Sequence, residues 1–262
     1  MNEKILVTGG TGVLGRRVVD LLHSAGVETR VLSHSAKPRT VHEDLLTGEG
    51  LEPAVRGIDT VVHCATSPFR RVREVDVVGT VRLLEAASLA GVGHFVYISI
   101  VGIDRASSHP YYRVKLDAER VVEGPPPHTI LRAPQFYDLV LIALRFLGRL
   151  PVMPVPRNFL GQPGDAGELA DRLVELALSG PAGRVPDIGG AEVGTLADAT
   201  RTYVEVTDFR SRTFQVPVPG KTARAFRDGA LVCPENAYGE IRWENLLRSR
   251  LENSGKRLQA TA

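Results

Sequence analysis

Short apolar runs alternate with segments of helical periodicity through the first half of the chain. The apolar runs predict strands over residues 4–8, 28–33, 59–64, 94–99 and 128–132. The periodic segments between them predict helices over residues 13–25, 72–90 and 110–123. In the second helix Val77, Val81 and Leu84 share one side, and Gly91 follows as a C-cap residue. This alternation predicts an α/β fold, a doubly wound parallel sheet with helices on both faces.

The alternation stops after Pro134. Helices are expected over residues 136–149, 168–178, 196–203, 221–227 and 243–251, and one more strand over residues 184–188. A proline-rich stretch, residues 151–156, follows the first of these helices. We therefore divide the chain into residues 1–135 and residues 136–262.

A glycine-rich segment, Thr8-Gly-Gly-Thr-Gly-Val-Leu-Gly15, lies between the first predicted strand and the first predicted helix. In that position Gly9 permits a tight turn, and Gly12 lets a pyrophosphate approach the backbone. Gly15 allows the helix to pack close to the strand. The free N–H groups at the start of the helix would face the phosphates. The segment predicts a dinucleotide site, and an ordinary glycine-rich turn is the alternative.

The composition of the chain narrows the classes of molecule that it can be expected to bind. The chain has 262 residues, 43% hydrophobic and 24% charged, with a net charge of +2, so nothing favours nucleic acid or an anionic membrane as a partner. The longest apolar stretch, residues 139–147, contains Arg145 and is too short to span a bilayer. Cys64 and Cys233 lack metal-ligand spacing, so no metal site is expected. Few cysteines and an immediate first strand predict a cytoplasmic protein without a signal peptide.

The form Thr-Gly-x-x-Gly-x-x-Gly resembles the extended and atypical branches of the short-chain dehydrogenase/reductase superfamily. Residues 61–65, 94–99 and 129–134 resemble segments of NmrA-like proteins at matching positions. The resemblance covers most of the chain and is firmest over residues 1–135. It implies an NAD(P)-binding Rossmann core over those residues. It also implies that residues 136–262 build the substrate side and partly return to the sheet, within a single structural domain overall.

The residues after the second predicted strand favour NADP over NAD. An acidic residue there would bind the ribose 2′-hydroxyl of NAD, but the segment 30–39 has none. Lys37 and Arg39 can pair with a 2′-phosphate, and Ser33 can donate a hydrogen bond to it. His34 stands where related sequences often carry arginine. The alternative is that these residues form an ordinary exposed loop.

The resemblance implies further cofactor contacts. Asp44 and Leu45 match the family's Asp-Leu pair, whose acid contacts the adenine amino group, and Cys64, Ala65 and Thr66 leave room for the cofactor where the third long strand ends. The cofactor-binding prediction comprises Gly9, Thr11, Gly12, Val13, Leu14, Gly15, Ser33, His34, Lys37, Arg39, Asp44, Leu45, Cys64, Ala65, Thr66, Lys115 and Pro134. We expect the adjacent His63 to be a packed strand residue.

Tyr111 and Lys115 stand four residues apart, so one helical face presents both. The pair also matches the superfamily's Tyr-x-x-x-Lys signature. A nearby ammonium favours the phenolate, and Tyr111 would donate a proton to a carbonyl oxygen. Ser99 ends a strand where the superfamily places a hydroxyl that polarises the substrate, although a serine there can also cap backbone groups. Asp76 lies where many relatives carry asparagine.

These features predict an NADP-dependent oxidoreductase that transfers hydride to a small carbonyl or quinone-like substrate. The alternative is an NADP(H)-binding redox sensor of NmrA type without turnover. Epimerase or dehydratase chemistry on a nucleotide sugar ranks last, because the chain is short for a sugar-nucleotide lobe. The sequence leaves the substrate, the direction of reaction and the oligomeric state open.

Overall fold

A computed structural model describes residues 3–33, 41–42, 44–209 and 212–259. It divides the chain into two compact units. The first unit comprises Met1–Ala133 and Ala166–Asp187, and the second comprises Pro134–Asp165 and Ile188–Ala262. The chain therefore enters the second unit, returns to the first, and enters the second again.

The first unit is built on a seven-stranded sheet with the order β3-β2-β1-β4-β5-β6-β9, in which every neighbouring pair is parallel. Its strands are β1 (Lys4–Thr8), β2 (Glu28–Ser33), β3 (Val41–His42), β4 (Thr60–His63), β5 (His94–Ile100), β6 (His128–Ala133) and β9 (Gly183–Arg184). The strand order reverses between β1 and β4, which is where such sheets bind ligands. The predicted doubly wound parallel sheet is confirmed.

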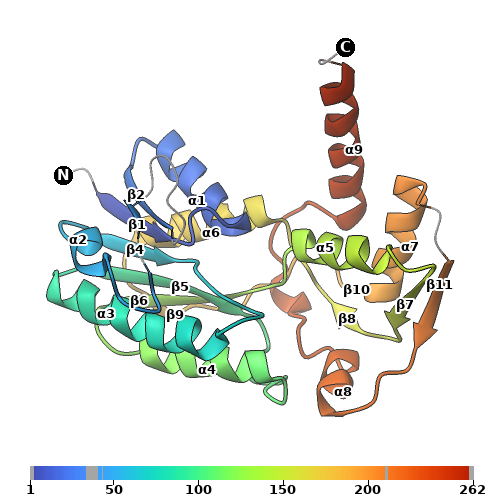
Figure 1. Ribbon diagram of the computed structural model, residues 1–262, viewed down its shortest axis with the longest axis horizontal. Helices are drawn as coiled ribbons and strands as arrows, with labels where there is room; N and C mark the ends of the chain where they lie inside the picture. Colours follow the sequence, from blue (N-terminus) through green and yellow to red (C-terminus); the bar gives the residue numbers. More distant parts are fainter. Residues whose placement is uncertain (1–2, 34–40, 43, 210–211, 260–262) are drawn as a thin grey trace. The chain divides into compact units, whose positions relative to one another are not determined.

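Helices cover both faces of this sheet (Figure 1). On one face α1 (Val13–Ser24) packs against α6 (Ala166–Ser179). On the other lie α2 (Leu51–Val55), α3 (Thr80–Leu89) and α4 (Pro110–Val122). Because helices bury both faces, β4 is buried along its whole length.

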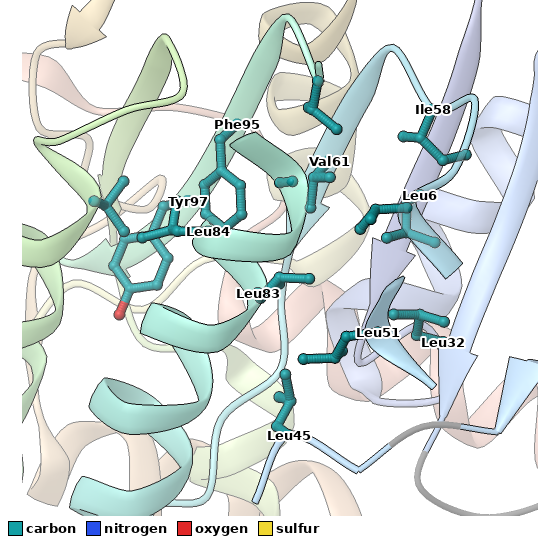
Figure 2. Close-up of a cluster of buried hydrophobic side chains, with 14 of the residues drawn as sticks. Leu6, Leu32, Leu45, Leu51, Ile58, Val61, Leu83, Leu84, Phe95 and Tyr97 are labelled. Carbon is teal, nitrogen blue, oxygen red and sulfur yellow. The ribbon is translucent and has the colours of Figure 1, made fainter. Parts of the chain in front are cut away.

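The main hydrophobic cluster of the first unit lies between the sheet and the α2–α4 layer. Figure 2 shows Val61 and Phe95 from the strands facing Leu83 and Leu84 of α3. Tyr97 belongs to the same cluster, and its phenol oxygen points away from Phe95. The cluster therefore has a polar edge on β5.

The helix predicted over residues 72–90 is not regular. A π-helical turn, η1 (Glu74–Gly79), precedes α3 and runs directly into it. The turn buries Asp76 together with Val77 and Gly79. Single π-turns inside helices are frequent at functional sites, because the extra residue redirects side chains.

The second unit contains short strands among helices. Its elements are α5 (Tyr137–Leu147), β7 (Val152–Pro156), β8 (Leu160–Gly161), β10 (Gly194–Thr195), α7 (Leu196–Thr207), β11 (Arg212–Val216), α8 (Lys221–Arg227), the 3₁₀ turn η2 (Pro234–Asn236) and α9 (Trp243–Gln259). The proline-rich stretch forms β7, where Pro154 and Pro156 lie opposite Phe214 and Val216 of β11. Proline is tolerated because each strand of a two-stranded sheet is an edge strand.

Aromatic side chains form the core of the second unit. Tyr137 of α5 is fully buried, and its ring centroid lies 5.5 Å from that of Trp243 on α9. The Trp243 indole N–H donates to the carbonyl of Ala199 on α7 at 2.9 Å.

In the first unit, the strand predicted over residues 184–188 is only the two-residue β9. Across the part of the chain that the structure describes, no helix is long and apolar enough to cross a membrane.

Candidate active site

The glycine-rich loop leaves β1 and enters α1 through two close backbone contacts. Gly9 has a φ of +64°, and a Cβ there would lie 2.8 Å from the Ala65 backbone. A Cβ on Gly15 would lie 2.3 Å from the carbonyl oxygen of Gly9. A Cβ on Gly12 would meet only that carbonyl, at 3.2 Å. Packing therefore requires glycine at 9 and 15, whereas Gly12 faces open space that suits a ligand.

The start of α1 fits an anion. Gly12 is the N-cap, with no side-chain cap and no acidic residue in the first turn. The first intrahelical bond runs from the Arg16 N–H to the Gly12 carbonyl at 3.2 Å. The amides of Val13, Leu14 and Gly15 precede that bond, so the helix itself does not satisfy them. The Leu14 side chain is buried and Thr11 is half-buried, so a ligand would meet chiefly the backbone.

The predicted adenosine contacts are only partly described. Ser33 ends β2 and is buried, whereas His34, Lys37 and Arg39 lie outside the described residues. Asp44 uses Oδ1 to accept the Leu46 amide at 2.8 Å, which shapes the turn it begins. The Leu45 side chain that follows is buried.

The segment after β4 is tied to the end of β1. The Cys64 amide donates to the Thr8 carbonyl at 3.2 Å, and the Ala65 amide donates to the Thr8 hydroxyl at 3.3 Å. Burial raises the pKa of the Cys64 thiol to about 12, so this thiol is uncharged at neutral pH. The segment therefore contributes backbone shape and small side chains rather than a nucleophile.

His63 is a packed strand residue, as expected. Its two ring nitrogens lie 2.6 Å from the Thr8 hydroxyl and 3.0 Å from the Thr80 hydroxyl. Burial, assisted by the Lys115 charge, lowers the pKa of His63 to about 3. The neutral imidazole thus links β1, β4 and α3.

Tyr111 opens α4 and reaches across to the segment after β4. Its phenol oxygen lies 3.0 Å from the Thr66 hydroxyl. Thr66 in turn donates to Asp76 Oδ1 at 2.5 Å, and the Ser67 amide donates to Asp76 Oδ2 at 3.0 Å. A chain of hydrogen bonds therefore joins Tyr111 to the buried carboxylate of the π-turn.

Lys115 lies one turn further along α4 and is buried. Its ammonium donates to the Tyr97 phenol at 2.5 Å and to the Ile98 carbonyl at 3.3 Å, and it lies 3.6 Å from Asp76 Oδ1. An ammonium has three N–H donors, so these three oxygens can engage all of them. The Tyr111 phenol and the Lys115 ammonium thus have different hydrogen-bond partners. Both groups are nevertheless connected to Asp76, Tyr111 through Thr66 and Lys115 directly.

Opposing influences act on the pKa of Tyr111. Burial is the largest and raises the pKa, the Lys115 charge and a hydrogen bond with Thr66 lower it, and the Asp76 charge raises it. The net direction is upward, because burial outweighs the lowering by the Lys115 ammonium. Tyr112, the competing phenol, is buried against His109 with ring centroids 4.7 Å apart, and burial raises its pKa to about 12.

Ser99 has a buried hydroxyl on β5. Its Oγ has no hydrogen-bond partner among the residues that the structure describes. The Ser99 hydroxyl therefore caps no backbone group of the described residues. Ser99 follows Tyr97 by two positions, so both lie on the same side of β5. A buried hydroxyl without a partner is unfavourable unless a ligand completes it.

From the sequence, no role was assigned to two residues that contact Lys115, namely Tyr97 and Asp76. Their contacts with Lys115 become visible only in the folded structure. A signal did exist, because Asp76 shares the buried side of its predicted helix with Val77 and Thr80. A carboxylate on a buried face requires a partner. Pro134, the remaining predicted cofactor residue, is buried where the second unit begins, directly after β6.

Residues 5–122 match the model of the family described as NAD dependent epimerase/dehydratase. A relative named photosystem II assembly factor Ycf39, from Trieres chinensis, is 28% identical over 59% of this chain and 53% of its own length. The 2-alkyl-3-oxoalkanoate reductase of Stenotrophomonas maltophilia is 28% identical over 77% of this chain and 62% of its own length. The chain thus spans less than two thirds of either relative.

Among solved structures, a short-chain dehydrogenase/reductase superfamily protein from Agrobacterium tumefaciens with bound NAD matches with a TM-score of 0.78. The match covers 99% of both chains at 21% sequence identity. At that identity the likeness shows the fold.

Proposed function

Because residues 5–122 match the model of the NAD dependent epimerase/dehydratase family, we propose that this protein is an NADP-dependent oxidoreductase. It reduces a small carbonyl or quinone-like substrate. The observation that carries the proposal is the combination of the half-buried Tyr111, the buried Lys115 and the Ser99 hydroxyl, which has no hydrogen-bond partner among the described residues. These residues and the glycine loop belong to the same compact unit.

Each of these residues has a separate role in the proposed carbonyl reduction. The amides at the start of α1 and the open side of Gly12 hold the pyrophosphate of a nicotinamide dinucleotide. That dinucleotide supplies the hydride when it is bound. Ser99 donates a hydrogen bond to the carbonyl oxygen, and Tyr111 gives that oxygen the proton that completes the alcohol. The Lys115 charge lowers the pKa of the Tyr111 phenol, which helps that phenol give up its proton.

The comparisons support reduction of an oxo group. The Stenotrophomonas maltophilia relative is named as a reductase of a 2-alkyl-3-oxoalkanoate, which carries such a group. We extend only that reaction class to this chain, since less than two thirds of that relative is spanned. The substrate of this chain belongs to the proposal as a class, a small molecule with a carbonyl or quinone oxygen.

The preference for NADP rests on the segment after β2. It has no acidic residue from 30 to 39, and Lys37 and Arg39 supply charges that match a 2′-phosphate. The test is titration of the purified protein with NADPH and with NADH, followed by nicotinamide fluorescence. We expect tighter binding of NADPH, and loss of that preference in the Lys37→Ala/Arg39→Ala variant. Arg56→Ala, an exposed arginine of the same unit, serves as the control.

Equal or stronger binding of NADH would remove the 2′-phosphate argument and leave the dinucleotide site. Binding of neither cofactor would remove the enzyme proposal altogether. The Arg56→Ala control should retain the wild-type preference, because a general loss of positive charge would otherwise explain the result.

A second candidate function is an NADP(H)-binding redox sensor without turnover. The observation that favours it is that protein oxygens already face the Lys115 ammonium on three sides. In a sensor, Lys115 would be a structural residue and would not need to contact the cofactor. A large difference in affinity between NADP⁺ and NADPH, with no turnover of carbonyls or quinones, would favour this function over the first.

A further inference from the structure

Asp76 and Lys115 form an ion pair at the centre of the candidate active site. Their side chains are 0% and 4% exposed, and the Lys115 ammonium lies 3.6 Å from Asp76 Oδ1. Removing one partner of a buried pair leaves an uncompensated charge, which is strongly unfavourable. The carboxylate and the ammonium therefore depend on each other, and the position of Asp76 determines how the polar groups around it are oriented.

The hydrogen bonds around Asp76 have a defined direction. The Thr66 hydroxyl has a single hydrogen, which it donates to Asp76 Oδ1 at 2.5 Å. At its 3.0 Å contact with Tyr111, Thr66 can then only accept. The Tyr111 phenol is consequently the donor, and this bond requires that the phenol keep its hydrogen.

We propose that Asp76 is a positioning residue that keeps Tyr111 protonated in the resting protein. Its carboxylate balances the Lys115 charge and orients Thr66 to accept from the Tyr111 phenol. This inference rests on the proposed function, in which Tyr111 donates a proton. Carbonyl reduction needs the protonated phenol and alcohol oxidation needs the phenolate. Asp76 therefore favours the protonation state of Tyr111 from which carbonyl reduction starts.

The groups that face Tyr111 come from each element around it. Lys115 is on the same helix, Asp76 is on η1, and Tyr97 is on β5. Burial raises the pKa of Tyr111, Lys115 lowers it, a hydrogen bond donated by Thr66 would lower it too, and Asp76 and Tyr97 raise it. Because the Thr66 hydrogen goes to Asp76, that lowering applies only when Asp76 no longer accepts it. The Tyr112 ring packs beside Tyr111 with centroids 5.8 Å apart. Among the described residues, Lys115 is the cation that acts on Tyr111, and the Asp76 charge opposes it.

The test is a pH titration of tyrosinate absorbance in the protein without cofactor or substrate. The difference between wild type and Tyr111→Phe isolates the signal of Tyr111. Asp76→Asn keeps the shape of the side chain and removes its charge, so the midpoint of Tyr111 should shift to lower pH. Glu74→Gln, an exposed acid on the same turn, is the matched control and should leave the midpoint in place.

An unchanged or raised midpoint in Asp76→Asn would overturn the inference, as would an equal downward shift in Glu74→Gln. Should Asp76→Asn fail to fold, Thr66→Val removes the oxygen that accepts from the Tyr111 phenol and leaves both charges of the buried pair in place. This variant, too, must lower the midpoint of Tyr111, and no change would contradict the proposal.

The titration needs no turnover, so the two proposals fail separately. A lowered midpoint in a protein that reduces nothing would leave the role of Asp76 intact and remove the enzymatic function. Turnover that depends on Tyr111, with a midpoint that does not respond to Asp76→Asn, would support the enzymatic function and remove the role of Asp76.

Discussion

Tyr111 differs from the other phenols of the site in where its hydroxyl points. It contacts Thr66 on the segment after β4, whereas Tyr97 accepts from Lys115 and Tyr112 packs against His109. A proton donor must reach the substrate oxygen. Of these three phenols, Tyr111 alone is half-exposed, since Tyr97 and Tyr112 are buried.

We expect Tyr111→Phe to lower kcat/KM for carbonyl reduction by about a hundredfold or more, because general acid catalysis is lost. Cofactor affinity should stay unchanged, since the glycine loop is untouched. Steady-state kinetics and fluorescence titration measure the two effects. Tyr112→Phe is the matched control and should retain activity. Full activity in Tyr111→Phe would exclude Tyr111 from the mechanism.

At the level of elements, the βα unit of β1, the glycine loop and α1 is defined by backbone contacts. Gly9 and Gly15 bring the start of α1 against the loop, and Gly9 also lies against Ala65 after β4. The π-turn η1 is a second such element, since its backbone places Asp76 within hydrogen-bond distance of Thr66, on the segment after β4. In both elements the path of the backbone determines where the functional groups lie, the free amides of α1 in one and the Asp76 carboxylate in the other.

Gly15→Ala should destabilise the protein by about 1–3 kcal/mol, because its Cβ has to displace the Gly9 carbonyl. It should also weaken cofactor binding, since the same displacement distorts the loop. Chemical denaturation followed by circular dichroism, together with fluorescence titration, checks both effects. Gly93→Ala, whose Cβ would lie 3.7 Å from the nearest atom, should change stability by no more than about 0.5 kcal/mol. Equal effects of the two substitutions would contradict the close-packing argument.

On the scale of the whole molecule, each compact unit has its own hydrophobic cluster. The first contains Phe95 and Tyr97, and the second contains Tyr137 and Trp243. His63 lies in the first unit, where it is neutral and buried. Because it joins three elements through Thr8 and Thr80, its protonation would break the centre of that unit.

Stability should fall as the pH drops below 6.5, and His63 should account for part of the loss. The folded pKa of His63 is lowered to about 3 from 6.5, so between these values only the unfolded chain binds the proton. The full difference corresponds to on the order of 5 kcal/mol, present above pH 6.5 and lost towards pH 3. His63→Gln should therefore show a shallower pH dependence than wild type.

The measurement is denaturation at several pH values, followed by circular dichroism. Fluorescence of the single tryptophan would be the wrong probe, because Trp243 lies in the second unit. His23→Gln, an exposed histidine, is the control and should keep the wild-type slope. A slope in His63→Gln as steep as that of wild type would contradict this role.

The parallel sheet, its helical layers and the glycine turn could be predicted from the sequence alone, because periodicity and glycine spacing are local properties of the chain. Strands β1 and β2 and helix α8 begin and end where their patterns predicted. The tertiary structure decided what depends on distant neighbours. It paired Asp76 with Lys115, 39 positions apart, and Tyr111 with Thr66, 45 positions apart. It also made a strand of the proline-rich stretch through β11. No local pattern encodes such pairs, since the burial that makes a charge require a partner exists only in the folded protein.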